Sequence, residues 1–128
     1  MKKQIINTNQ APAPIGPYNQ SVQSGPFLFI SGQIRFIMEA IEIEQDIEKA
    51  THIVMKYLKE ILAASSLTFE DVVKVSIFLA HMDDFAVVNG VYGQYFDVET
   101  DPASEAIAVK ELPKSAPIEM SLIAAVKE

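Results

Sequence analysis

The sequence of 128 residues contains no cysteine and no tryptophan, and only two histidines. Without cysteine the chain can form no disulfide, no thiolate nucleophile and no zinc–thiolate site. The two histidines, His52 and His81, have no carboxylates beside them at the spacing of metal ligands, so the sequence predicts no metal site.

Basic residues are also scarce, because ten Lys and Arg stand against seventeen Asp and Glu, for a net charge of −7. Proteins bind nucleic acid largely through lysine and arginine, which release counterions from the phosphates, so a nucleic-acid partner is disfavoured. No apolar run is long enough to span a bilayer, and no apolar stretch of a secretory signal follows the first lysines. We expect one domain over residues 1–128, no membrane partner, and a cytoplasmic location.

The apolar residues are patterned as a mixture of strands and helices. A helix over residues 46–65 is predicted by apolar residues at three- and four-residue steps, with Asp46 as N-cap. A second helix is predicted to start at Asp83 and Asp84, with one buried stripe. Its expected members are Phe85, Val88, Tyr92, Tyr95 and Phe96. Strands are expected over residues 4–7, 19–24, 27–33, 72–79, 104–110 and 118–126, with a further short strand near 40–44.

This order predicts an α+β fold, in which a mixed six-stranded sheet carries two helices on one face. The second face of such a sheet would be left uncovered, and a chain that is 49% hydrophobic cannot leave that face in water. We therefore expect the chain to oligomerise.

The stretch from residue 15 to residue 35 combines a rigid Gly16-Pro17 turn, the aromatic hydroxyl of Tyr18, and a strand that runs into Ser31-Gly32-Gln33. Proline fixes its own φ and restricts the residue before it, so Tyr18 is presented from a stiff turn. Glycine at a strand end lets a ligand approach the main chain. The stretch is interpreted as one wall of a small-molecule cleft, and the alternative is a hairpin turn with a satisfied tyrosine.

Six segments occur in one order that is similar to a known family. They read APxxIGPYxQ (11–20), FxSGQI (29–34), DVVKxxxFL (71–79), MxDFAxVNxVYxxYF (82–96), PA (102–103) and LPKxxxIE (112–119). Together they resemble the RidA family, also called YjgF/YER057c or endoribonuclease L-PSP. The resemblance implies a chorismate-mutase-like fold, a homotrimer, small-molecule clefts between subunits, and hydrolysis of enamines and imines to keto compounds and ammonia. It also implies that no cofactor is needed.

Carried over position by position, the resemblance implies a set of site residues. Tyr18 matches the cleft tyrosine and Glu119 the glutamate that positions the attacking water, which makes these two the candidate catalytic residues. Ser31, Gly32 and Asn89 match substrate-binding positions. The family's carboxylate-binding arginine is replaced by Ser104, and the next inward position is Ala106. A cation could be supplied instead by Arg35 or Lys110, although a lone basic residue at a strand end is more often part of the solvated surface.

A lost arginine–carboxylate pair removes both charge and orientation, and costs about 2–5 kcal/mol of binding. One hypothesis is therefore a RidA-like deaminase with an altered substrate preference or reduced activity. The alternative is a non-catalytic trimer that binds a small molecule and has a regulatory role. A ribonuclease or translation inhibitor is less favoured, because the chain has a charge of −7 and no cluster of histidine and basic residues.

Overall fold

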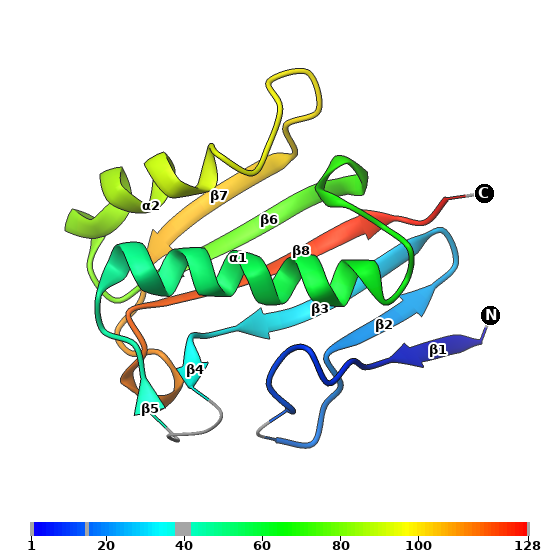
Figure 1. Ribbon diagram of the computed structural model, residues 1–128, viewed down its shortest axis with the longest axis horizontal. Helices are drawn as coiled ribbons and strands as arrows, with labels where there is room; N and C mark the ends of the chain where they lie inside the picture. The colour runs from blue at the N-terminus through cyan, green and yellow to red at the C-terminus, as the bar shows by residue number, and fades with distance from the viewer. Residues whose placement is uncertain (1, 15, 38–41, 128) are drawn as a thin grey trace.

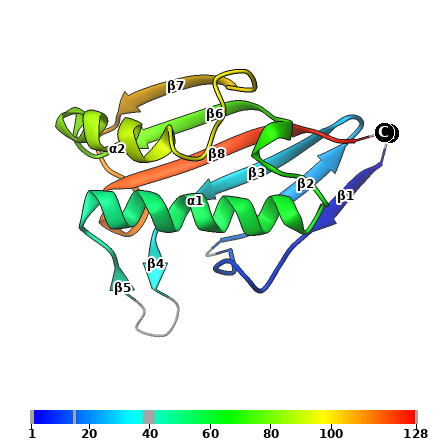
Figure 2. The ribbon, with the colours of Figure 1, turned by 45° about the horizontal axis from the view of Figure 1, so that its top comes forward.

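A six-stranded sheet runs through the whole molecule and carries both α-helices on one face (Figures 1 and 2). The computed structural model describes residues 2–14, 16–37 and 42–127. The strands lie in the order β1-β2-β3-β8-β6-β7. Their bounds are β1 Lys3–Ile6, β2 Ser21–Ser24, β3 Phe27–Gln33, β6 Val72–Leu79, β7 Ala103–Ala108 and β8 Ile118–Ala125.

The sheet is mixed, as the order of elements predicts. All neighbouring strands are antiparallel except β6 and β7, which are parallel and are joined by a crossover through helix α2. The pairing of β3 with β8 shifts its register between Ile30 and Gln33. This irregularity falls at Ser31 and Gly32, so it changes the course of β3 at the residues expected to lie in the site.

Helix α1 (Ile47–Ala63) confirms the predicted helix and its cap. The Asp46 carboxylate accepts a hydrogen bond from the Lys49 backbone N–H at 3.0 Å, which satisfies one of the free donors of the first turn. The buried face of α1 packs on the sheet through Val54, Leu58 and Ile61. Within the described ranges, none of the helices is both long enough and apolar enough to cross a membrane.

Helix α2 (Phe85–Tyr92) is shorter than predicted. A 3₁₀ turn over Met82–Asp84 precedes it, and the side chain of Asp84 makes no capping hydrogen bond. The helix ends at Gly93, whose N–H bonds to the Asn89 carbonyl, because glycine is a poor helix former.

The predicted buried stripe of α2 is therefore wrong in part. Phe85 is 38% exposed, and Val91 takes its place beside Val88 among the buried residues. Tyr95 and Phe96 lie beyond the helix end, where each makes an edge contact with the ring of Phe69.

A small second sheet pairs β4 (Phe36–Ile37) with β5 (Glu42–Ile43). The short strand expected near residues 40–44 is confirmed at 42–43, while residues 40 and 41 lie outside the described ranges. The partner strand β4 was not predicted, because no turn residue separates the two strands in the sequence.

The helix-covered face and the open face of the sheet differ in burial. Along β8 the residues alternate between buried and half-buried, with Ile118, Met120 and Leu122 under the helices. On the other face Phe27 is 41% exposed, Phe29 45% and Ile107 48%. No described element covers this face (Figure 2), so the structure leaves a set of large apolar side chains in contact with solvent.

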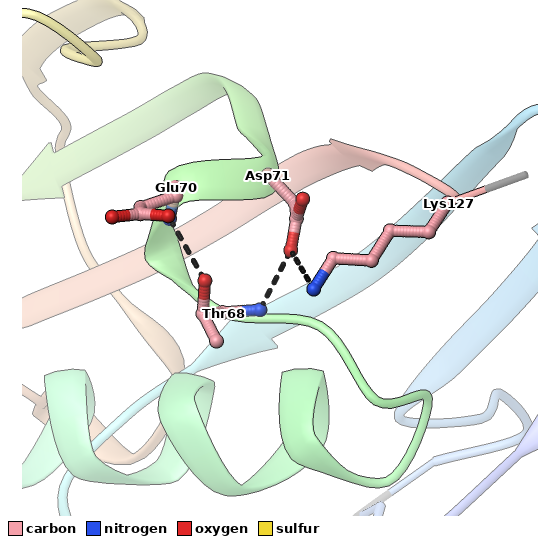
Figure 3. Close-up of polar contacts among 4 residues, drawn as sticks. All are labelled: Thr68, Glu70, Asp71 and Lys127. Carbon is pink, nitrogen blue, oxygen red and sulfur yellow. Dashed lines mark hydrogen bonds and ion pairs between the residues drawn. The ribbon is translucent and has the colours of Figure 1, made fainter.

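A short 3₁₀ turn (Phe69–Asp71) leads from α1 into β6 and is held by reciprocal side-chain bonds (Figure 3). Thr68 N–H donates to the Asp71 carboxylate at 2.9 Å, and Glu70 N–H donates to the Thr68 hydroxyl at 3.3 Å. The same Asp71 oxygen lies 3.6 Å from Lys127 Nζ, so one carboxylate fastens the start of β6 to the end of the chain.

Candidate functional site

The turn that carries Tyr18 is tight. Tyr18 N–H donates to the Gly16 carbonyl at 2.8 Å across Pro17, so three residues complete the turn. Tyr18, which follows the turn, is 45% exposed. The hydroxyl of Ser31 donates to the Asn19 carbonyl at 2.6 Å, so this hydroxyl fastens the turn to β3. Tyr18 therefore follows a tight turn that is hydrogen-bonded to β3.

A buried amide supports the same turn from behind. Gln20 is 2% exposed, and its Nε2 donates to the carbonyls of Thr8, Ala11 and Pro12 at 3.0, 3.2 and 2.9 Å. Its Oε1 accepts from the Thr8 N–H at 2.7 Å. The segment APxxIGPYxQ contains Gln20, but sequence reasoning gave this residue no role.

A small pocket of about 30 Å³ lies between this turn and the end of β3. Tyr18 and Gly32 both line it, as predicted from their types and spacing. The other lining residues, which sequence reasoning did not assign to the site, are Pro12, Ala13, Pro14, Gln20, Gln33 and Ile34. Residues 12–14 form one wall of the pocket, and Gln20 donates to the carbonyl of Pro12 at the start of this wall.

Glu119 lies directly beside Gly32. A Cβ atom built on Gly32 would come within 2.9 Å of three side-chain atoms of Glu119, so a side chain at this position would displace the carboxylate. Burial raises the pKa of Glu119 above its ordinary value. A carboxylate with a raised pKa is a better proton acceptor, which suits the predicted part of Glu119 in positioning water. Among the residues described, no group of three or more His, Cys, Asp or Glu could hold a metal.

Ser104 and Ala106 lie on β7, which is the edge strand at the other end of the sheet from β1. They pair with Val75 and Ile77 of β6, which are buried beneath the helices, so both face the helix side. Asn89 is exposed on α2, which lies with α1 on that same side (Figure 1). These three predicted residues thus share one side of the sheet.

The hydroxyl of Tyr92 lies beside Ser104. Its oxygen is buried, and no hydrogen bond of good geometry reaches it from the described residues. Burial raises the pKa of Tyr92, contact with Ser104 lowers it, and the nearby charge of Asp101 raises it further. Tyr92 was predicted only as a core residue of α2.

The predicted site residues form two groups that one chain does not bring together. Glu119 pairs with Phe78 on the open face of the sheet, whereas Ser104 pairs with Val75 on the helix face. Strand alternation separates these faces, and β6 lies between β8 and β7. The side chain of Glu105 turns away from Ser104 and binds Lys74 at 2.9 Å.

Neither proposed replacement cation contacts Ser104 in the described part of the chain. Arg35 Nη1 donates to the Tyr57 hydroxyl of α1 at 3.4 Å. Its Nε is buried and has no hydrogen-bond partner there. Lys110 lies exposed beyond the end of β7. Their part in binding stays a prediction.

Comparison with known proteins gives a match over almost the whole chain. Residues 8–126 match the family model described as "Endoribonuclease L-PSP". A RutC family protein of Synechocystis is 42% identical over 126 residues, which cover 97% of each chain. Escherichia coli TdcF, named as a candidate reactive intermediate deaminase, is 37% identical over 124 residues, or 95% of this chain and 96% of TdcF.

Two solved structures have the same fold. RidA from an Antarctic Psychrobacter superposes with a TM-score of 0.90 at 35% identity, covering 96% of this chain and 99% of that one. E. coli TdcF, solved with bound serine, superposes with a TM-score of 0.89 at 35% identity, covering 97% of this chain and 99% of that one.

Proposed function

The chain belongs to the RidA family, which the endoribonuclease L-PSP model describes, and from this membership we propose that it hydrolyses reactive imines or enamines to carbonyl compounds and ammonia. The observation that carries the proposal is the half-buried carboxylate of Glu119 beside Gly32, with a raised pKa, next to the pocket lined by Tyr18. The name of TdcF as a candidate reactive intermediate deaminase supports it.

In the proposed reaction, the oxygen of a water molecule bonds to the carbon of the C=N group. Glu119 accepts a proton from this water and returns one to the nitrogen. The hydroxyl proton of the resulting carbinolamine then passes to the amine nitrogen, the C–N bond breaks, ammonia leaves, and the carbonyl forms. Tyr18 bounds the site and orients the substrate, while Gly32 leaves room for the Glu119 carboxylate against β3. The reaction needs neither cofactor nor metal.

We further propose that the active form is a homotrimer in the cytoplasm, with substrate bound in clefts between subunits. Two observations support the trimer. Phe27, Phe29 and Ile107 are exposed on the open sheet face, and burying them in an interface would be favourable. Glu119 and Ser104 lie on opposite faces of one sheet, so a second copy is required to bring both kinds of residue to one substrate.

The test uses imines that form continuously in solution. An amino-acid oxidase releases 2-iminobutanoate, and semicarbazide traps the part that is not yet hydrolysed. An active deaminase lowers the yield of semicarbazone in proportion to its concentration. The protein is compared with Glu119→Gln, and with Glu48→Gln as a control on the exposed first turn of α1. A Glu119→Gln variant as active as the native chain would refute the assigned chemistry.

A non-catalytic small-molecule-binding trimer with a regulatory role is the second candidate. One observation favours it: Ser104 stands where the family arginine would bind a substrate carboxylate, and the described cations do not reach it. If no imine is hydrolysed while keto compounds still bind, this second function replaces the first.

A further inference from the structure

A cavity of about 350 Å³ lies where three connecting segments meet, and the proposed reaction makes no use of it. It is lined by residues 68–70 of the turn before β6, residues 95–97 after α2, and Thr100 of the loop before β7. These segments lie close together in both ribbon views (Figures 1 and 2). The cavity shares no lining residue with the pocket beside Tyr18, and its volume is that of a small-molecule site.

Three aromatic rings contribute to the wall of this cavity. The ring of Phe69 makes edge contacts with the rings of Tyr95 and Phe96, at centroid distances of 5.8 and 5.2 Å. Such a contact covers a ring face of only one of the two partners, so ring faces remain available to a ligand. The Tyr95 hydroxyl is hydrogen-bonded to Nδ1 of His52 on α1 at 2.7 Å, which fixes its ring. The aromatic wall is therefore preorganised, which lowers the cost of binding.

The charged side chains of the lining, Glu70 and Asp97, are both acidic and exposed. Oδ1 of Asp97 accepts the backbone N–H two residues further on at 3.1 Å. Among the described residues, neither its Oδ2 nor the Glu70 carboxylate has a hydrogen-bond or ion-pair partner. Lys127 lies near this turn but binds Asp71 (Figure 3), and the sequence has no lysine or arginine from residue 75 to residue 109. The cavity thus attracts cations and repels anions.

Ring faces and carboxylates together favour one class of ligand. An aromatic face attracts a cation through its quadrupole, and a carboxylate adds a direct attraction between charges. A methylated ammonium group loses water to reach a ring more readily than the strongly hydrated ammonium of lysine. We propose that this cavity binds a small organic cation that carries a methylated ammonium group. The inference does not depend on the proposed imine hydrolysis, because the two sites share no lining residue.

Choline and its uncharged isostere 3,3-dimethylbutan-1-ol test whether the cavity recognises the charge. The two molecules have the same shape, because a carbon atom replaces the nitrogen. Titration of the full chain, followed by NMR at the backbone amides of residues 68–70 and 95–97, measures the affinity and locates the site. Choline should bind about 10-fold or more tightly than the alcohol. Equal affinities, or shifts that do not saturate with choline, would overturn the proposal.

Removal of single charges separates the cavity from the overall negative charge of the chain. Glu70→Gln and Asp97→Asn preserve the shape of the lining, and each should weaken choline binding about 2- to 5-fold without affecting the alcohol. Glu99→Gln is the matched control, since Glu99 is exposed in the same loop but does not line the cavity. A loss for Glu99→Gln as large as that for Asp97→Asn would show a general field effect and would overturn the site.

Two further measurements test the rings and the kind of cation. Phe96→Leu keeps an apolar side chain but removes a ring, and should weaken choline binding about 5-fold or more. Unchanged choline binding by this variant would overturn the part assigned to the rings. A tripeptide with lysine between two glycines should bind more weakly than choline. Tighter binding of the tripeptide would indicate a basic segment of a partner protein and would overturn the assignment of a small methylated cation.

Discussion

A Cβ atom on Gly32 would lie 2.5 Å from Oε2 of Glu119 and 2.7 Å from its Cδ. Gly32→Ala must therefore push the carboxylate aside. A shift of about 1 Å in a catalytic group can reduce a rate about 100-fold, and we expect a loss of imine hydrolysis of that order. The semicarbazide assay measures it. A Gly32→Ala variant with native activity would mean that Glu119 does not act on the substrate from this position.

At Gly90, substitution by alanine should have the opposite effect to that at Gly32. A Cβ atom there would meet nothing within 4 Å, and Gly90 lies inside α2. Gly90→Ala should stabilise the protein by about 0.5–1 kcal/mol, because alanine is the better helix former. Urea unfolding measures this change. Destabilisation would show that the space above Gly90 is filled in the assembled protein.

The raised pKa of Glu119 predicts how stability depends on pH. Because the folded chain holds this proton more tightly than the unfolded chain, the group favours folding below the ordinary carboxyl pKa of 4.5, and this contribution is lost as the pH rises through the raised value. Below pH 4.5, the Glu119→Gln variant should have the same melting temperature as the native protein. Above the raised pKa of Glu119, the variant should be the more stable protein. Melting curves from pH 3 to 8 test this, and a difference that is constant with pH would contradict it.

Asp71 and Lys127 should contribute unequally to stability. Asp71→Ala removes the acceptor for the Thr68 N–H as well as the ion pair, and should cost about 1 kcal/mol. Lys127→Met removes only a contact at 3.6 Å, and the lysine side chain is 60% exposed. Its effect should stay within a few tenths of a kcal/mol. Denaturant unfolding of both variants tests this. Equal losses of stability would indicate that the ion pair, and not the turn, accounts for the contribution of Asp71.

The open sheet face predicts the oligomeric state. Phe29→Asp places a charge in the proposed subunit interface and should convert the proposed trimer to monomers. Val98→Asp serves as control, since Val98 is 86% exposed in the loop before β7. Sedimentation at micromolar concentration gives the mass of each. A native protein that sediments as a monomer would refute the assembly and the composite site with it.

The sequence predicts those parts of the fold that depend on local patterns. Asp46 caps α1 because its neighbours in the chain supply both the free N–H and the apolar stripe. The alternating residues of β8 likewise indicate which of them face the helices. The end of α2 was misjudged, because apolar residues at helical spacing continue past Gly93 into a segment where Tyr95 packs on Phe69.

The candidate site was less predictable, because its contacts join residues distant in the chain. Tyr18 and Gly32 could be assigned from the chemistry of a turn and a strand end. The bonds from Gln20 to residues 8–12, and the position of Tyr92 behind Ser104, depend on how separate segments pack. That Glu119 and Ser104 lie on opposite faces follows from strand register, which the sequence does not specify alone.

The four bonds of the buried Gln20 amide bear on the thermodynamics of binding. They hold the chain from Thr8 to Pro12, which leads into the wall formed by residues 12–14, before any ligand arrives. The conformational entropy of this loop is therefore lost during folding, and binding does not have to order it again. Even a small, weakly contacting molecule can then be held on this side of the cleft, which suits a substrate that exists only briefly in water.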